Sequence, residues 1–200
     1  MTKIFNEWET DNIQVSDLGM AQYMNLKSKM VPHNFGKSNK KAFEKAKINI
    51  IERLVNKIMR SGQGKRKLSG KFIRGRRSCG KKLLSMRIVE NAFRKIEYRT
   101  NNNPVQVFVT ALENSAPRED ITRQKKGGIA YTSSVDMSSL KRIDEALKNI
   151  AIAAFANSFN KKISAEEALS EEIILASNKD IKSFGIKRRD EVERIAKASR

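Results

Sequence analysis

One stretch of the sequence has the residue types and spacing of a nucleotide-binding loop. Gly75–Lys81, "GRRSCGK", fits the first seven positions of the pattern G-x-x-x-x-G-K-[ST], in which backbone amides and the lysine hold phosphates. The eighth position requires a hydroxyl that binds magnesium, and here it is Lys82. No strand is predicted before the loop. We therefore expect no nucleotide hydrolysis and interpret the glycines as letting a basic segment bend around phosphates.

The other groups capable of catalysis stand apart from one another. Cys79 is the only cysteine and His33 the only histidine, so no metal site can be built from Cys and His. The basic surroundings of Cys79 also fit a reactive thiol, although an ordinary loop cysteine is the simpler interpretation. The carboxylate pairs Glu166–Glu167 and Glu171–Glu172 are predicted on a solvated helix face. The sequence thus predicts no catalytic residue, no metal and no cofactor.

The chemistry that the sequence does offer is positive charge. The chain of 200 residues has 41 Lys and Arg against 22 Asp and Glu, a net charge of +19. Residues 37–100 hold 21 basic and four acidic residues, and so carry +17 of that excess. Solubility alone does not require so large a positive excess, and the repulsion between like charges makes such an excess unfavourable for the isolated protein. The distribution predicts a polyanionic partner, bound through phosphates with strong salt dependence.

Residues 62–80, "GQGKRKLSGKFIRGRRSCG", form a basic loop interrupted by five glycines. The loop has too few large apolar side chains to form a core of its own. It is also long for a connection within a compact domain. Arginine side chains can grip phosphate with two parallel hydrogen bonds or stack on bases. We expect this loop and the preceding lysines to bind nucleic acid through Lys37, Lys40, Lys41, Lys65, Arg66, Lys67, Arg74, Arg76 and Arg77.

A predicted β-hairpin at 119–136 has no apolar face to bury against the rest of the chain. A two-residue turn at Gly127–Gly128 would pair Lys126 with Ile129 and Gln124 with Tyr131. A lone two-stranded ribbon is marginal in water, so a mobile surface loop is one interpretation. The other is a probe that becomes ordered in a nucleic-acid groove, with Tyr131 as its aromatic contact.

The elements that carry these residues are mostly helical. Apolar side chains at helical spacing, with Asn103–Pro104 and the capping box that starts at Ser164 as start signals, predict about six helices. They are expected at 42–60, 82–98, 104–114, 139–157, 165–177 and 186–198. A shorter helix is plausible within 18–30, and i, i+4 ion pairs are expected at Asp190–Arg194 and Glu193–Lys197.

The expected architecture is a mainly α fold with one helical domain, 42–200, the protruding two-stranded hairpin, and an extended N-terminal arm, 1–41. Trp8 and Phe5 are candidate anchors of the arm. No apolar run approaches the roughly 18–20 residues of a membrane span, and the N-terminus has no hydrophobic signal region. These features predict a soluble intracellular protein, and the single cysteine fits a reducing compartment.

Several motifs together resemble one family. They are "NKIMRSG", "GKKLLSMRIVENAF", "NPVQVFVTALENSAPRED", "TRQKKGGIAYTSSVDM" and "IKRRDEVERIAKASR", which follow one another within residues 48–200. They resemble the universal ribosomal protein seven family of the small subunit. The segments "KIFNEWETDNIQVSDL" and "VPH" look like its eukaryotic cytoplasmic branch. Against the short turn of that family, residues 63–78 are interposed here, with seven basic residues among them.

The resemblance implies a structural role in translation. It implies binding to the 3′ major domain of small-subunit rRNA, an early part in assembly of the subunit head beside other head proteins, and a cytoplasmic location with assembly that begins in the nucleolus. The hairpin and the C-terminal helix are expected near exit-site tRNA and mRNA. A free architectural nucleic-acid binder related to this family is the alternative.

The resemblance also assigns residues by position. Those matching basic positions of the rRNA-facing region are Arg53, Lys57, Arg60, Lys81 and Lys82. Those matching the hairpin are Arg123, Lys125, Lys126, Gly127, Gly128 and Tyr131. Those matching the basic C-terminal end are Lys187, Arg188, Arg189, Arg194 and Arg200.

Overall fold

The protein is mainly α-helical, as predicted. The computed structural model describes residues 3–36, 41, 43–60, 67–68, 71–72 and 80–200. Within these ranges the elements are α1 (Leu18–Ala21), η1 (a 3₁₀ helix, Glu44–Lys47), α2 (Ile50–Arg60), β1 (Lys67–Leu68), β2 (Lys71–Phe72), α3 (Lys82–Thr100), α4 (Pro104–Ser115), β3 (Glu119–Lys126), β4 (Ile129–Asp136), α5 (Ser139–Ser158), α6 (Ala165–Ser177) and α7 (Phe184–Ala198).

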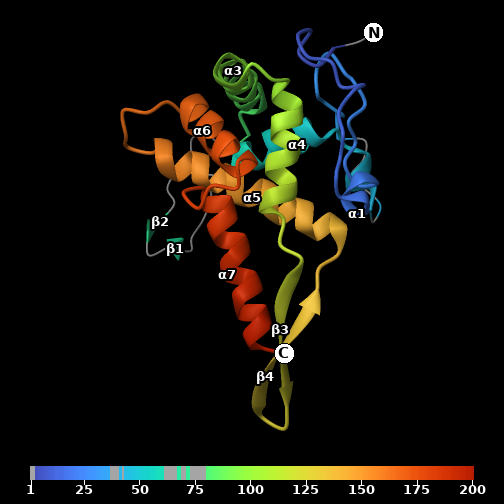
Figure 1. The fold of residues 1–200 in the computed structure, drawn as a ribbon, viewed down its shortest axis with the longest axis vertical. Helices are drawn as coiled ribbons and strands as arrows, with labels where there is room; N and C mark the ends of the chain where they lie inside the picture. Colours follow the sequence, from blue (N-terminus) through green and yellow to red (C-terminus); the bar gives the residue numbers. More distant parts are fainter. Residues whose placement is uncertain (1–2, 37–40, 42, 61–66, 69–70, 73–79) are drawn as a thin grey trace.

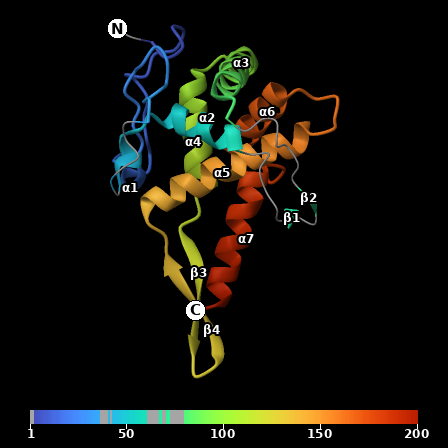
Figure 2. The ribbon, with the colours of Figure 1, turned by 180° about the vertical axis from the view of Figure 1, so that it is seen from behind.

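The helices form a body from which the β3–β4 hairpin projects (Figure 1). Helix α7 leaves the body beside β3 and ends part of the way along the hairpin, so the C-terminus lies next to the ribbon. The N-terminal arm lies on the part of the molecule away from the hairpin tip, as the reverse view also shows (Figure 2). The hairpin tip extends beyond every helix that the structure describes, so none of these helices covers it.

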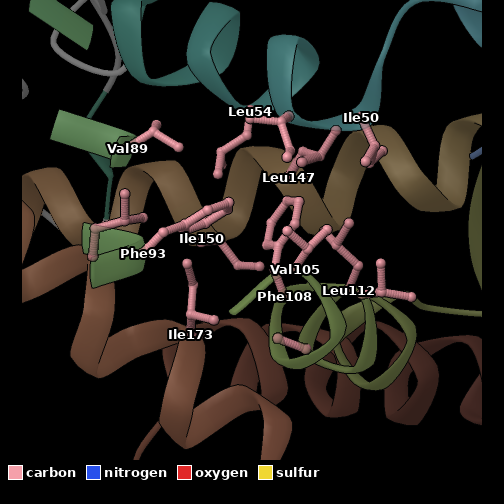
Figure 3. Packing of buried hydrophobic residues seen from close by; sticks show 14 of the residues in the cluster. Ile50, Leu54, Val89, Phe93, Val105, Phe108, Leu112, Leu147, Ile150 and Ile173 are labelled. Carbon is pink, nitrogen blue, oxygen red and sulfur yellow. The ribbon is translucent and has the colours of Figure 1, made fainter. Parts of the chain in front are cut away.

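The core lies where α4 and α5 meet α2, α3 and α6 (Figure 3). Its largest fully buried side chains include Phe93, Phe108, Leu112, Leu147 and Ile150. They recur at helical spacing, and their burial removes apolar surface from water, which is the main force that holds the helices together. The rings of Phe93 and Phe108 lie 5.8 Å apart in a tilted arrangement.

The N-terminal arm is packed on this body through apolar anchors. Trp8 is only 4% exposed, its indole donates a hydrogen bond to Glu97 Oε2 at 2.9 Å, and its ring meets Phe93 edge-on. Phe5 packs on the edge of Trp8 in turn, as expected. Helix α1 spans only four residues, Leu18–Ala21, and is therefore shorter than the helix that the sequence suggests within 18–30.

The helix predicted at 42–60 is divided by Asn49. Its side-chain oxygen accepts a hydrogen bond from the Ile51 amide at 2.8 Å and so caps α2, while its amide donates to the Lys27 carbonyl at 2.9 Å. Ile48, just before it, has extended dihedrals. The Ile50 amide also donates to the Asn25 carbonyl. Contacts with the arm therefore override the continuous apolar periodicity that predicted one helix.

The interpretation of Glu172 as a solvated residue was wrong. Its side chain is buried, and Oε1 accepts hydrogen bonds from Ser183 Oγ at 2.7 Å and the Gly185 amide at 3.0 Å, which caps the start of α7. Burial raises the pKa of this carboxyl, and hydrogen bonds from Gly185 and Ser183 oppose the shift only in part. Its neighbour Glu171 is exposed. A helix face that reads as polar in sequence is covered here by α7.

The ion pairs expected within α7 also form differently. Asp190 pairs with the adjacent Arg189 at 2.6 Å, and Glu193 accepts a hydrogen bond from the Arg118 amide at 3.0 Å. Spacing along a helix ignores neighbouring elements, and here the segment between α4 and β3 supplies the partner of Glu193.

Candidate nucleic-acid interface

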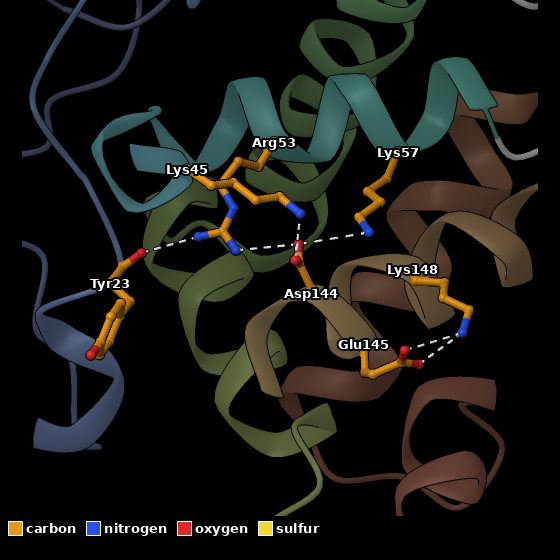
Figure 4. Close-up of polar contacts among 7 residues, drawn as sticks. All are labelled: Tyr23, Lys45, Arg53, Lys57, Asp144, Glu145 and Lys148. Carbon is orange, nitrogen blue, oxygen red and sulfur yellow. Dashed lines mark hydrogen bonds and ion pairs between the residues drawn. The ribbon is translucent and has the colours of Figure 1, made fainter. Parts of the chain in front are cut away.

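Three cations from two elements surround one carboxylate of α5 (Figure 4). Asp144 Oδ1 lies 3.3 Å from Arg53 Nη2 and 3.6 Å from Lys57 Nζ, and its Oδ2 accepts a hydrogen bond from Lys45 Nζ. Burial alone would raise the pKa of the Asp144 carboxyl, but the Lys45 hydrogen bond and the charges of Lys57 and Arg53 outweigh it and hold the pKa below its ordinary value.

These residues line an open pocket, here called the α2 pocket, of about 360 Å³. Its walls contain five cations and one acid, and are made by Lys41, Lys45, Ile48, Arg53, Asn56, Lys57, Arg60 and Asp144. The opposite side of α2 buries Ile51, Leu54 and Val55 in the core, which fixes the direction in which the pocket opens. The result is a strongly positive concavity between α2, η1 and α5.

Arg53 belongs to the interior of this arrangement. Its side chain is 2% exposed, and Nη1 donates a hydrogen bond to the Tyr23 carbonyl at 3.0 Å. Burial lowers the pKa of its guanidinium, and Asp144 opposes this effect. The expectation that Arg53 contacts phosphate at the surface therefore needs correction: it ties the arm to α5. Lys57 is 29% exposed, while Lys41 and Arg60 are exposed.

Lys82 is also engaged within the protein. Its ammonium lies 2.7 Å from Oε1 of Glu52, a fully buried carboxylate that also accepts a hydrogen bond from the Asn34 amide at 3.0 Å. This contact joins the arm, α2 and the start of α3. Lys81, just before α3, is exposed.

Most of the other cations predicted before α3 lie outside the described residues. They are Lys37, Lys40, Lys65, Arg66, Arg74, Arg76 and Arg77. Lys67 lies in β1, for which the structure describes the backbone.

The β3–β4 hairpin has the predicted turn and register. Lys126 pairs with Ile129 and Gln124 with Tyr131, around Gly127 and Gly128 with φ of 55° and 82°. Both glycines occupy the left-handed region that a Cβ disfavours, as this kind of turn requires. Arg123 and Lys125 are exposed, and Tyr131 is 54% exposed.

Ion pairs hold the base of the hairpin. Asp120 pairs with Lys141 of α5 at 2.7 Å, and Glu119 accepts a hydrogen bond from Arg200, beyond the end of α7. The predicted C-terminal set is therefore divided between internal and outward roles. Arg200 braces the hairpin and Arg189 donates to the Asn114 carbonyl at 2.5 Å, whereas Lys187 and Arg194 are exposed. Arg188 pairs with Glu191.

The sequence interpretation missed Lys45 and Asp144 as members of one site. They lie 99 residues apart in the chain, and only the packing of α5 beside α2 brings them together. Among the residues described, no group of three His, Cys, Asp or Glu side chains is placed to hold a metal ion, and no helix is long and apolar enough to cross a membrane.

The structure thus belongs to the class of small helical proteins that present positively charged surfaces, here with a hairpin that projects from the helical body and is held at its base. Comparison with known proteins places the chain within it: residues 20–200 match the family described as Ribosomal protein S7p/S5e, and the chain belongs to this family. It is thus a structural ribosomal protein of the small subunit and not an enzyme.

Three archaeal relatives, each named small ribosomal subunit protein uS7, match nearly end to end. The protein of Methanococcus aeolicus is 44% identical over 199 residues, which cover 99% of this chain and 98% of the relative. Those of Methanococcoides burtonii and Methanothermobacter thermautotrophicus are each 42% identical, with full coverage of both chains.

The eukaryotic branch is not supported by these relatives, all of which are archaeal. Their matches include the N-terminal arm and span residues 63–78, so neither segment separates this chain from archaeal proteins. The expectation of nucleolar assembly depended on the eukaryotic branch and stays a prediction.

Proposed function

We propose that this protein binds the 3′ major domain of small-subunit rRNA and helps to assemble the head of the subunit. The observation that carries the proposal is the α2 pocket, where five cations and one acid line a concavity between α2, η1 and α5. Each cation that meets a phosphate releases a condensed counterion, which makes such a surface a strong and salt-sensitive site for RNA. Membership of a ribosomal family supports rRNA as the polyanion.

The hairpin and the end of α7 have a different task in this proposal. They lie near exit-site tRNA and mRNA, and other surfaces of the body contact neighbouring head proteins. Support comes from the geometry of the ribbon: its base is held by Lys141 and Arg200, while Arg123, Lys125 and Tyr131 are exposed along it. A ribbon braced in this way positions side chains and contributes little to the core.

Sedimentation tests the proposal directly. Lysate from growing cells is separated on sucrose gradients after washing with moderate salt, and the protein is detected by immunoblot. We expect it in the small-subunit peak. Its presence only in the free soluble fraction, together with a pull-down that recovers mixed DNA or RNA and no rRNA, would contradict the proposal and indicate a free nucleic-acid binder.

A further inference from the structure

The α2 pocket has more hydrogen-bond donors than its own acid can use. Each lysine ammonium has three donor hydrogens, and the single carboxylate of Asp144 shares two oxygens among Lys45, Arg53 and Lys57. The buried Arg53 also keeps one N–H, at Nε, without a partner in the described part of the chain. Lysine hydrogens beyond those that Asp144 accepts therefore remain at the rim, whereas the Nε–H of Arg53 is buried and is not part of it.

We propose that the α2 pocket is a seat for one phosphate group of an RNA backbone, and that Asp144 is the positioning residue that holds Lys45 and Lys57 at its rim. The inference rests on the proposed function and names the contact that the site makes. Lys41, Asn56 and Arg60 complete the lining. With five cations against one acid, the lining keeps an excess of four positive charges while it is empty.

The position of Asp144 explains why an acid belongs in a phosphate site. A free lysine side chain samples many rotamers, and fixing it on a ligand costs conformational entropy. In the folded protein the ion pairs with Asp144 already restrict both lysines, so this entropy is lost on folding and not on binding. Asp144 is itself held by the buried guanidinium of Arg53. An arriving phosphate then meets donors that already converge.

This role predicts a change in RNA affinity opposite to the change that net charge alone predicts. Removing one acid raises the net charge by one, so charge alone predicts that Asp144→Asn binds RNA more tightly. If Asp144 positions the lysines, the same change weakens binding. Glu145 is the matched control: it is the next residue on α5, and it pairs with Lys148 at 2.9 Å, outside the α2 pocket (Figure 4).

The experiment compares full-length wild type, Asp144→Asn and Glu145→Gln. Binding of a 3′ major-domain rRNA fragment is measured by filter retention over a series of KCl concentrations. We expect Asp144→Asn to bind about tenfold more weakly, with a salt slope lower by about 1 as one phosphate contact is lost. Glu145→Gln is expected to match or exceed wild type, and Asp144→Glu to recover part of the loss. Equal or tighter binding by Asp144→Asn than by Glu145→Gln would overturn the inference.

A second measurement decides the matter even if Asp144→Asn does not fold. The melting temperature is measured in inorganic phosphate and in chloride at equal ionic strength, because a ligand that binds the folded state raises it. Phosphate should stabilise wild type and Lys148→Ala but not Lys57→Ala, and equal stabilisation of both variants would exclude the seat. If phosphate stabilises the protein but the rRNA fragment does not bind, the proposed function fails and the seat stands.

Discussion

At the scale of single residues, the guanidinium of Arg53 makes Asp144 important for stability. Arg53 is almost fully buried and has one acidic partner among the described residues, Asp144. Removing one member of a buried ion pair leaves the other charge desolvated without compensation, which costs about 3–5 kcal/mol in typical cases. Lys45 and Lys57 add contacts to the same carboxylate, so the loss of Asp144 also loosens η1 against α2.

The stability contributed by Asp144 should disappear in acid. The folded state holds its pKa below the ordinary aspartate value of about 4. The contribution is therefore fully present above that ordinary value and is lost as pH falls through the lower folded-state pKa. We expect Asp144→Asn to reduce the free energy of unfolding by about 3 kcal/mol at pH 7, and by progressively less below about pH 4.

Urea denaturation followed by circular dichroism from pH 3 to pH 8 checks this prediction. Glu145→Gln serves as the control, because the partly exposed Glu145–Lys148 pair is worth well under about 1 kcal/mol. A difference between wild type and Asp144→Asn that stays constant down to pH 3 would contradict the assignment of this contribution to the carboxylate.

At the scale of residues, the sequence predicted which side chains are charged but not which residues they contact. The cationic character of α2 is visible in the sequence, including Lys57 and Arg60. Arg53 is buried between Asp144, 91 residues away in the chain, and the Tyr23 carbonyl, and Lys57 is partly covered at the same carboxylate. One sequence without long-range contacts cannot indicate such a pairing, and the same reason explains the wrong interpretation of Glu172.

At the scale of elements, local signals were reliable wherever the chain itself supplied the cap. Asn103 accepts a hydrogen bond from the Val105 amide at 3.0 Å at the start of α4, and Ser164 does the same for the Glu167 amide at 3.2 Å before α6. Both starts were predicted. The division of the helix at Asn49 was not predicted, because its cause is the arm, a distant segment.

Helix α7 is seated on α4 through a close approach at Gly185. A Cβ built on this glycine would lie 2.8 Å from Ser115 Oγ and 3.2 Å from Ser115 Cβ. Because Ser115 is fully buried, it has little room to move. We expect Gly185→Ala to lower the free energy of unfolding by about 1–3 kcal/mol, as overpacking does, although Gly→Ala in an open helix raises it by up to about 1 kcal/mol.

A double-mutant cycle in guanidinium chloride measures this contact. Ser115 Oγ has no hydrogen-bond partner in the described structure, so Ser115→Ala alone should change stability little. Combined with Gly185→Ala, it should restore part of the loss, since the nearest contact is gone. A stabilising Gly185→Ala, or a double variant in which the two effects simply add, would show that α7 adjusts freely.

At the scale of the whole molecule, the helical body contains the core that stabilises the fold, and the hairpin presents exposed side chains. All of the large core side chains lie in the body or the arm, and the ribbon shares only its base with them. The mainly α architecture and the hairpin register were predicted from periodicity and the two glycines. How far the hairpin stands clear of the helices was not, because this distance depends on the direction of α7 and β3.

The variant Arg123→Ala with Lys125→Ala separates these two tasks. Both side chains are exposed on one face of the hairpin, so we expect the free energy of unfolding to change by less than about 0.5 kcal/mol. Small subunits assembled with the variant should sediment normally but bind deacylated tRNA at the exit site more weakly, as measured by filter binding. Thr122→Ala with Ser133→Ala, on the other face, is the control. Loss of folding in the Arg123 and Lys125 variant would overturn the division of tasks.

The shielding of the Arg53–Asp144 pair also has a consequence for purification. At about 1 M salt, charges exposed to water are screened within roughly 3 Å, whereas pairs shielded by protein are screened much less. A concentrated salt wash should therefore strip copurifying nucleic acid from the outward cations while the contacts around Asp144 persist. The same wash relieves repulsion within a chain of net charge +19. We expect the ratio of absorbance at 260 and 280 nm to fall during such a wash with the helical circular dichroism signal unchanged, which would give a clean starting material for titrations with RNA.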